Sequence, residues 1–313
     1  MGKLTSVTAF APATVANVSC GFDIMGFAID AIGDRVTVAY ADANTVKVTG
    51  PYGHLIPAAW EKNTASVAVQ AYLTFIQKSG LTFSISLEKN MPLGSGMGSS
   101  ASSSAAAVFA VNHLLGDVLS TKELIPFAME GERVASGSAH ADNVAPSLLG
   151  GFVLIRSYHP LDIITVTSPD ELFCAVVHPH IELHTSDARR ILQSEIPIGD
   201  VIKQTANTAG FMVGLLTEDY SLLGRSMSDL LAEPKRTRLI PGFDEAKQAA
   251  MQAGALGCGI SGSGPSIFAL SKGMSCAEEI AQAIKKSFLK VGLDSEAFTS
   301  SLNVKGAFVV DSK

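Results

Sequence analysis

The feature that most constrains the fold is a glycine- and serine-rich loop between a strand-like segment and a helix-like segment. Residues Thr82–Glu88 alternate between apolar and polar side chains, as in a half-buried strand. Residues 91–101 then read MPLGSGMGSSA, and their three alternating glycines permit positive φ and a close approach of the backbone to a ligand. Small and apolar residues over Ser99–Leu115 predict a helix that this loop opens.

This loop is a candidate phosphate cradle. The free N–H groups and the dipole at a helix N-terminus attract anions, so phosphate can bind there without a lysine. The loop is not a Walker A motif, because the sequence GK[ST] is missing from it. From the residues alone, a turn that needs glycine only for its geometry is an equal alternative.

A second glycine-rich stretch, residues 257–265, reads GCGISGSGP and contains the pattern GxGxxG. A dinucleotide fingerprint requires a strand before it and a helix after it. Here a predicted helix precedes the glycines, and a predicted strand, Ser266–Leu270, follows them. The stretch is therefore interpreted as a tight turn, or as a wall that completes a neighbouring site.

A third stretch, Glu130–Asn143, carries several polar side chains. Ser120 and Glu123 form a capping-box pattern that predicts a helix to about Ala135, and Glu132 flanks the apolar face of that helix. With a loop serine, Glu132 offers the oxygen ligands that Mg²⁺ prefers, although a solvated glutamate is the alternative. The segment after the helix, which includes His140, Asp142 and Asn143, is expected to be a loop of turn or capping residues.

Strands and helices interleave along the chain without a strict βαβ alternation. This order predicts an α+β protein, with helices packed on a mixed sheet. The polar, proline-containing segment Ser157–Glu171 is the best candidate boundary, so we expect one domain over residues 1–160 and a second over residues 161–313. The other expected strands are Arg35–Ala41, Thr45–Thr49, Gly151–Arg156, Leu172–Val177 and Val304–Val310, and the other expected helices are Thr64–Lys78, Asp187–Ser194, Val201–Leu216, Phe243–Ala253 and Cys276–Val291.

Charge and composition exclude several functions. The 313 residues include 23 Lys and Arg against 29 Asp and Glu, a net charge of −6 that argues against nucleic acids and anionic membranes as partners. Polar residues interrupt the longest apolar run, Ala101–Leu115, so we expect no transmembrane segment. The four cysteines are widely separated and suggest neither a zinc site nor a disulfide framework. We expect a cytoplasmic protein.

Taken together with an N-terminal segment, these motifs resemble the GHMP kinases. The segment Ala11–Asp23 reads APATVANVSCGFD, the loop lies near residue 95, and Gly259–Pro265 reads GISGSGP near the C-terminus. Their order and spacing match that family over essentially the whole chain. The segments His140–Gly151 and Glu233–Gly242 most resemble the members that phosphorylate L-homoserine.

The resemblance implies a fold, an activity and a set of cofactors. The fold has an N-terminal, ATP-binding domain like the second domain of ribosomal protein S5 and a ferredoxin-like C-terminal domain. The implied activity is ATP-dependent and Mg²⁺-dependent phosphorylation of the side-chain hydroxyl of L-homoserine to O-phospho-L-homoserine, in threonine biosynthesis. A GHMP-type kinase for another small alcohol, such as mevalonate or a sugar, and a non-catalytic nucleotide-binding relative are the alternatives. The oligomeric state stays open, with a homodimer as one option.

The resemblance also implies site residues. Ser100 and Glu132 would be Mg²⁺ ligands, with Asp142 as a candidate base and Asn143 in a positioning role, although the sequence does not fix which of the two takes the base position. The nucleotide-binding residues would be Met91, Pro92, Leu93, Gly94, Ser95, Gly96, Met97, Gly98, Ser99, Ser100 and Ala101. The amino-acid pocket would be formed by Asn17, Asp23, His140, Asp142, Asn143, Thr185, Arg189 and Arg236.

Overall fold

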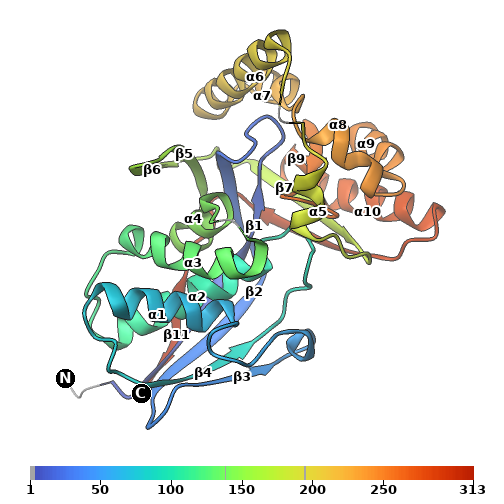
Figure 1. Cartoon of the computed structure of the whole chain (residues 1–313). Helices are drawn as coiled ribbons and strands as arrows, with labels where there is room; N and C mark the ends of the chain where they lie inside the picture. The colour runs from blue at the N-terminus through green and yellow to red at the C-terminus, as the bar shows by residue number, and fades with distance from the viewer. Residues whose placement is uncertain (1–3, 138, 194) are drawn as a thin grey trace.

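The computed structural model describes residues 4–137, 139–193 and 195–313. Two β-sheets form the framework, and helices pack on each of them (Figure 1). This architecture confirms the α+β prediction. Among the described residues, no helix has the length and apolar character needed to span a bilayer.

The first sheet has seven strands and runs in the order β11-β1-β2-β4-β3, with β5 paired to β2 and β6 paired to β5. The parallel β3–β4 pair makes the sheet mixed, since the other pairs are antiparallel. Its strands are β1 (Ser6–Ala16), β2 (Met25–Tyr40), β3 (Thr45–Thr49), β4 (Phe83–Glu88), β5 (Phe152–Tyr158), β6 (Leu161–Val166) and β11 (Phe308–Ser312).

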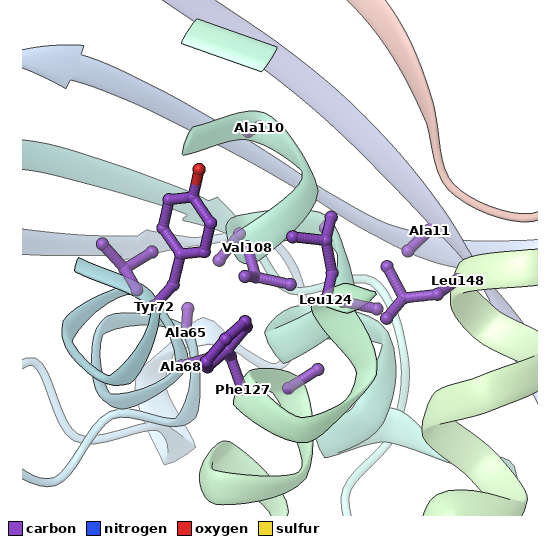
Figure 2. Packing of buried hydrophobic residues seen from close by; sticks show 14 of the residues in the cluster. Ala11, Ala65, Ala68, Tyr72, Val108, Ala110, Leu124, Phe127 and Leu148 are labelled. Carbon is purple, nitrogen blue, oxygen red and sulfur yellow. The ribbon is translucent and has the colours of Figure 1, made fainter. Parts of the chain in front are cut away.

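Four helices and two short 3₁₀ turns belong to this sheet. Ala65 and Ala68 of α1 lie in one cluster with Val108 of α2, and Figure 2 shows Tyr72 and Phe127 among the labelled side chains there. The Tyr72 hydroxyl donates a hydrogen bond to Asn112 Oδ1 (2.8 Å), so its polar end is satisfied inside the core. The elements are η1 (Gly53–Leu55), α1 (Thr64–Phe75), α2 (Ser99–Leu114), η2 (Thr121–Leu124), α3 (Ile125–Ser136) and α4 (Ala141–Leu149).

The second sheet has four antiparallel strands in the order β10-β7-β9-β8. In chain order these are the fourth, first, third and second strands, with α9 between the first two and α10 between the last two. This β-α-β-β-α-β order confirms the ferredoxin-like prediction. The elements are β7 (Leu172–Pro179), α5 (Thr185–Arg190), α6 (Ile198–Thr217), α7 (Tyr220–Ser226), α8 (Glu233–Arg236), η3 (Thr237–Leu239), α9 (Phe243–Gln252), β8 (Gly257–Ile260), β9 (Ile267–Lys272), α10 (Met274–Lys290) and β10 (Ser295–Ser301).

The sequence predicted most of the helices and strands but missed the 11-residue strand β1 and several shorter elements. The capping box of Ser120 and Glu123 is present as expected. The C-terminal end of the helix predicted over Asp187–Ser194 falls partly outside the described residues, because Ser194 is not described. The missed elements are β1, β6, α4, α7, α8, β8 and β10.

The expected boundary after residue 160 stays a prediction, and the sheet topology bears on it. β6 follows residue 160 but pairs with β5 in the first sheet. The C-terminal strand β11 also returns to the first sheet, where it pairs with β1. The two sheets are therefore not divided by a single point along the chain.

The expectation of a loop around Asp142 and Asn143 is wrong. Both residues lie in the first turn of α4, and His140 is the N-cap. Pro146 lies inside this helix and cannot donate to the Asp142 carbonyl, which argues locally against a helix. Tertiary packing stabilises the helical conformation instead. α4 lies so close to Gly26 of β2 that a Cβ on this glycine would be 1.9 Å from the Asp142 carbonyl oxygen.

Candidate active site

The glycine- and serine-rich loop connects β4 to the N-terminus of α2, as predicted. Gly98 is the N-cap of α2, with φ 67° and ψ 35°. Gly94 and Gly96 also have positive φ. A Cβ on Gly98 would lie 2.2 Å from Thr14 Oγ1, and one on Gly96 would lie 2.4 Å from the Ser261 carbonyl oxygen. These positions therefore require glycine for both conformation and space.

Segments distant in the sequence hold this loop in place. Thr14 N donates to the Met97 carbonyl (3.1 Å), and Ser266 N donates to the Ser95 carbonyl (3.1 Å). The Ser261 hydroxyl donates to the Gly96 carbonyl (2.8 Å). The second glycine-rich stretch is thus the turn of the β8–β9 hairpin, and it also supports the first loop.

A buried ion pair lies beneath the start of α2. Lys89 and Asp34 are 1% and 0% exposed, and the Lys89 ammonium donates to the Asp34 carboxylate. The same ammonium donates to the Ser99 carbonyl and to the Ser103 hydroxyl. Asn90 N also donates to Asp34 Oδ1 (2.9 Å). The pair therefore ties the strand end to the first turn of the helix.

The two predicted metal ligands come together at this helix end. Glu132 on α3 is 7% exposed, and its carboxylate accepts a hydrogen bond from Ser100 on α2. Burial raises the pKa of Glu132, while the Ser100 hydrogen bond and the Lys89 ammonium act in the opposite direction. A buried carboxylate beside a hydroxyl is a donor set suited to a hard cation.

Asp142 and Asn143 point toward the same place from α4. Asp142 is 4% exposed, and its Oδ1 accepts no hydrogen bond from the described residues. Burial raises the pKa of Asp142 to about 7, and the nearby Asp23 carboxylate adds to the rise. Asn143 Oδ1 accepts a hydrogen bond from Thr14 Oγ1 (2.8 Å), which fixes its amide beside Gly98.

Opposite charges face each other on the other side of the cavity. Arg189 Nη2 donates to Asp23 Oδ1 (2.7 Å) and to Oδ2 (3.0 Å). The same nitrogen lies 3.3 Å from His140 Nδ1. Burial lowers the pKa of His140, which favours the neutral imidazole between these charges.

Arg236 is the second guanidinium of this group and is 3% exposed. Its Nη1 donates to the Gly262 carbonyl (2.9 Å), and its Nε donates to the Ala188 carbonyl (3.2 Å). Asn17 Nδ2 donates to the same Gly262 carbonyl (2.7 Å), and Asn17 Oδ1 accepts from Asp23 N (3.0 Å). One turn of the β8–β9 hairpin thus positions both Arg236 and Asn17.

Apart from the buried Lys89–Asp34 pair and the residues that hold the loop from behind, the groups described above line one cavity of about 100 Å³. It includes every residue predicted for the amino-acid pocket, both predicted metal ligands and part of the phosphate loop. The lining residues are Asn17, Asp23, Gly94, Ser95, Gly96, Gly98, Ser99, Ser100, Glu132, His140, Asp142, Asn143, Thr185, Arg189, Arg236, Gly262 and Ser263.

A second cavity of about 360 Å³ adjoins the first and shares Gly94, Ser99, Ser100 and Thr185 with it. Its wall is more apolar than that of the first cavity. Apolar and aliphatic lining residues include Leu55, Ile56, Pro57, Leu93, Val134 and Leu183. A ligand that fills both cavities would pass across the mouth of α2.

Some predicted nucleotide-binding residues do not line these cavities. Met91, Met97 and Ala101 are buried in the hydrophobic clusters, and Pro92 is also buried. They support the loop from behind instead of facing the cavity. Their roles in nucleotide binding stay predictions.

Sequence reasoning missed several contributors to the site. Lys89 and Asp34 lie outside every motif, and a lone buried ion pair leaves no local pattern. Ser263 lies within the second glycine-rich stretch and lines the cavity. The ring of Phe22 lies under both guanidiniums, with its centroid 5.3 Å from Arg236 Cζ and 5.8 Å from Arg189 Cζ. Its position in the sequence, directly before Asp23, could have indicated that it belongs to the site.

Comparison with known proteins gives consistent matches. Residues 66–151 match the family model for the GHMP kinases N-terminal domain, and residues 211–290 match the model for the GHMP kinases C-terminal domain. A homoserine kinase from Chloroherpeton thalassium is 50% identical, over 98% of this chain and 100% of the relative. A homoserine kinase from Xylella fastidiosa is 41% identical, over 96% and 92%.

Solved structures give the same picture. The crystal structure of a homoserine kinase from Cytophaga hutchinsonii matches with a TM-score of 0.94 and 50% identity, covering 99% of each chain. The structure of Leishmania major mevalonate kinase with R-mevalonate matches with a TM-score of 0.71 at 18% identity, covering 96% and 98%. At that identity, the second match concerns the fold alone.

Proposed function

Since the chain belongs to the GHMP kinase family, we propose that it catalyses the ATP-dependent phosphorylation of the side-chain hydroxyl of L-homoserine. The observation that carries the proposal is the single cavity in which a phosphate-binding helix end faces a pocket of paired opposite charges. A kinase for a small zwitterionic alcohol requires these two features next to each other.

The nucleotide binds across both cavities. Its phosphates lie at the N-terminus of α2, where backbone N–H groups and the helix dipole favour negative charge. The adjoining cavity of about 360 Å³, with its more apolar wall, receives the nucleoside. The buried Lys89 and Asp34 neutralise each other, so Lys89 supports the helix end and the loop amides carry the recognition.

Ser100 and Glu132 would hold Mg²⁺. A hard cation takes one or two protein oxygens together with substrate phosphates and water, which fits this pair at the mouth of α2. When bound, Mg²⁺ neutralises charge on the phosphates. The burial of Glu132 costs free energy in its charged form, so a cation at its carboxylate would relieve that cost.

The amino acid binds through its two charges. Its carboxylate is held by Arg189 and Arg236, because a planar guanidinium forms charge-assisted hydrogen bonds with carboxylates. Its ammonium is held by Asp23. Asp23 and Arg189 pair with each other, so a zwitterion that binds between them exchanges one ion pair for two. An anion without an ammonium would leave Asp23 unpaired, which disfavours mevalonate.

The reaction joins the substrate hydroxyl oxygen to the γ-phosphorus of ATP and breaks the bond between that phosphorus and the oxygen of the leaving ADP. The hydroxyl proton passes to Asp142, whose pKa of about 7 suits proton transfer near neutral pH. Asn143 positions the hydroxyl, since its side chain is fixed against Thr14. Most of the catalysis then comes from positioning and charge stabilisation.

The proposal is tested by supplying ATP and Mg²⁺ with either L-homoserine or R-mevalonate. We expect ADP release with L-homoserine only, and a product whose mass and phosphorus spectrum match O-phospho-L-homoserine. ADP release with mevalonate alone would assign a different alcohol substrate. Nucleotide binding without turnover on a panel of amino alcohols would support a non-catalytic role instead.

A further inference from the structure

Helix α6 carries a buried glutamine, Gln204, which joins two segments of the amino-acid pocket. The residue is 6% exposed, and its Nε2 donates to the Cys20 carbonyl (2.8 Å) and to Asp229 Oδ1 (3.4 Å). Its Oε1 accepts a hydrogen bond from Leu230 N (2.9 Å). A single side chain thus links the segment that leads to Asp23 with the segment that leads to α8.

Asp229 holds the start of α8. Its carboxylate is 9% exposed and accepts hydrogen bonds of 2.8 to 3.2 Å from the N–H groups of Leu231, Ala232 and Glu233. A short polar side chain at such a position satisfies the free donors that begin a helix. Arg236 is the last residue of α8, so the place of this carboxylate determines the place of the Arg236 backbone. Burial lowers the pKa of Arg236, and the negative charge of Asp229 opposes this shift.

At the other end of the link, the β1–β2 connection has an unusual backbone. Four of its residues have a positive φ, namely Asn17 (70°), Val18 (41°), Ser19 (58°) and Asp23 (60°). Residues other than glycine rarely adopt this conformation, and a β-branched residue such as Val18 does so at a particular cost. The conformation persists only where surrounding contacts fix it. The hydrogen bond from Gln204 to the Cys20 carbonyl is one of these contacts.

We propose that Gln204 is a positioning residue for amino-acid binding, which acts with Asp229 to fix the spacing between Arg236 and Asp23. Neither Gln204 nor Asp229 is among the described residues that line the cavity of about 100 Å³, so both act through residues that do. The carboxylate and the ammonium of an amino acid are attached to one carbon and therefore have a fixed separation. The inference rests on the proposed function, because L-homoserine is the ligand whose two charges Arg236 and Asp23 would bind.

This role differs from a general contribution to stability. The phosphate loop is held by other residues, Thr14, Ser261 and Ser266. Loss of Gln204 should therefore weaken the binding of the amino acid more than the binding of the nucleotide. A residue that only stabilised the fold would lower the amount of active protein, and hence the apparent kcat, but would leave both KM values unchanged.

Steady-state kinetics of Gln204→Met tests this difference, because methionine keeps the length of the side chain without its amide. We expect the KM for L-homoserine to rise about tenfold, with kcat and the KM for ATP within about threefold of the parent chain. Thr208→Val is the matched control on α6. Thr208 Oγ1 also donates to the Cys20 carbonyl (2.8 Å), but within the described part of the chain its hydroxyl forms no hydrogen bond to the segment before α8. This variant should therefore keep both KM values close to those of the parent chain.

A double variant tests whether Gln204 acts through Arg236. Since Arg236→Leu removes the group that Gln204 would position, adding Gln204→Met should raise the KM for L-homoserine by less than about threefold more. Asp229 provides a second, independent pair of variants. Asp229→Asn keeps an oxygen that can accept from the N–H groups of α8, so its KM for L-homoserine should rise less than that of Asp229→Ala.

The results separate this inference from the proposed function. An active parent chain overturns the inference if Gln204→Met keeps the parent KM for L-homoserine or raises both KM values equally. A full tenfold effect of Gln204→Met on top of Arg236→Leu, or equal KM values for the two Asp229 variants, also overturns it. A parent chain that is inactive with L-homoserine refutes the proposed function itself, and the inference with it.

Discussion

Replacing Asp142 with asparagine should stabilise the protein and impair it as a kinase. Asp142 is 4% exposed, and burial raises its pKa from 3.8 to about 7. A raised carboxylate pKa means that folding disfavours the charged form. The Asp142 charge therefore destabilises the folded state. This destabilisation is small below pH 4, grows as the pH rises, and reaches its full value above pH 7. Each unit of pKa corresponds to 1.36 kcal/mol, so the full effect on the free energy of unfolding is about 4 kcal/mol.

Asparagine keeps the shape of the side chain without the charge. The stabilisation by Asp142→Asn should therefore grow by roughly 2–3 kcal/mol between pH 5 and pH 8. Urea unfolding at both pH values measures it, followed by the fluorescence of Trp60, the single tryptophan, which precedes α1 beside the first sheet. Asp42→Asn, at an exposed position, is the control and should show no such dependence.

The same variant should lose most of its turnover with L-homoserine, because a neutral amide cannot accept the proton. General acid–base catalysis typically contributes about 10²–10⁴-fold, which sets the expected loss. A stability gain of the same size at pH 5 and pH 8 would refute the claim that Asp142 carries a buried charge at neutral pH. If the stability gain depends on pH but turnover is unchanged, Asp142 carries a buried charge but does not act as the base.

Three further predictions concern other groups of the site. Glu132→Ala should lower turnover and raise the Mg²⁺ concentration for half-maximal activity by about tenfold or more; an unchanged rate at limiting Mg²⁺ would contradict its role as a ligand. Arg236→Leu should raise the KM for homoserine by roughly 10–100-fold, as expected for one lost charge-assisted hydrogen bond. The KM for ATP should change by less than threefold. Equal changes in the two KM values would mean that Arg236 binds the phosphates of ATP instead. Lys89→Met should destabilise the fold by about 3–5 kcal/mol, because it leaves the Asp34 carboxylate without its partner in the interior. Adding Asp34→Leu should restore most of this loss, as measured by urea unfolding of both variants. A double variant that is no more stable than the single variant would refute this explanation.

The phosphate loop could be predicted from the sequence because its chemistry is local. Strand, glycines and helix start follow one another within about twenty residues, and anion binding at a helix N-terminus needs little else. α4 could not be predicted from its own residues, since Pro146 and the small side chains around it indicate a loop. Packing against Gly26 of β2 decides its conformation, and no local pattern contains that information.

The amino-acid pocket shows the same limit more strongly. Its residues come from four segments distant in the sequence: Asn17 and Asp23 from the β1–β2 connection, His140 from the start of α4, Arg189 from α5 and Arg236 from α8. Singly, each has an ordinary structural explanation, and only the resemblance to a family connected them. The structure adds what that resemblance lacked, namely that Asp23 and Arg189 pair with each other.

This internal pair explains how the site can select a zwitterion without a large pocket. Two partly buried charges of opposite sign stabilise each other, so a ligand must replace both partners to avoid leaving one unpaired. Arg236 adds a second guanidinium, which forms no hydrogen bond with Asp23. Its positive charge is therefore free to bind the carboxylate of the amino acid. Removing Asp23 and Arg189 together, as Asp23→Asn with Arg189→Gln, should therefore impair homoserine binding while leaving the fold and nucleotide binding intact. If the double variant binds homoserine as tightly as the parent chain in calorimetry, recognition does not pass through this pair.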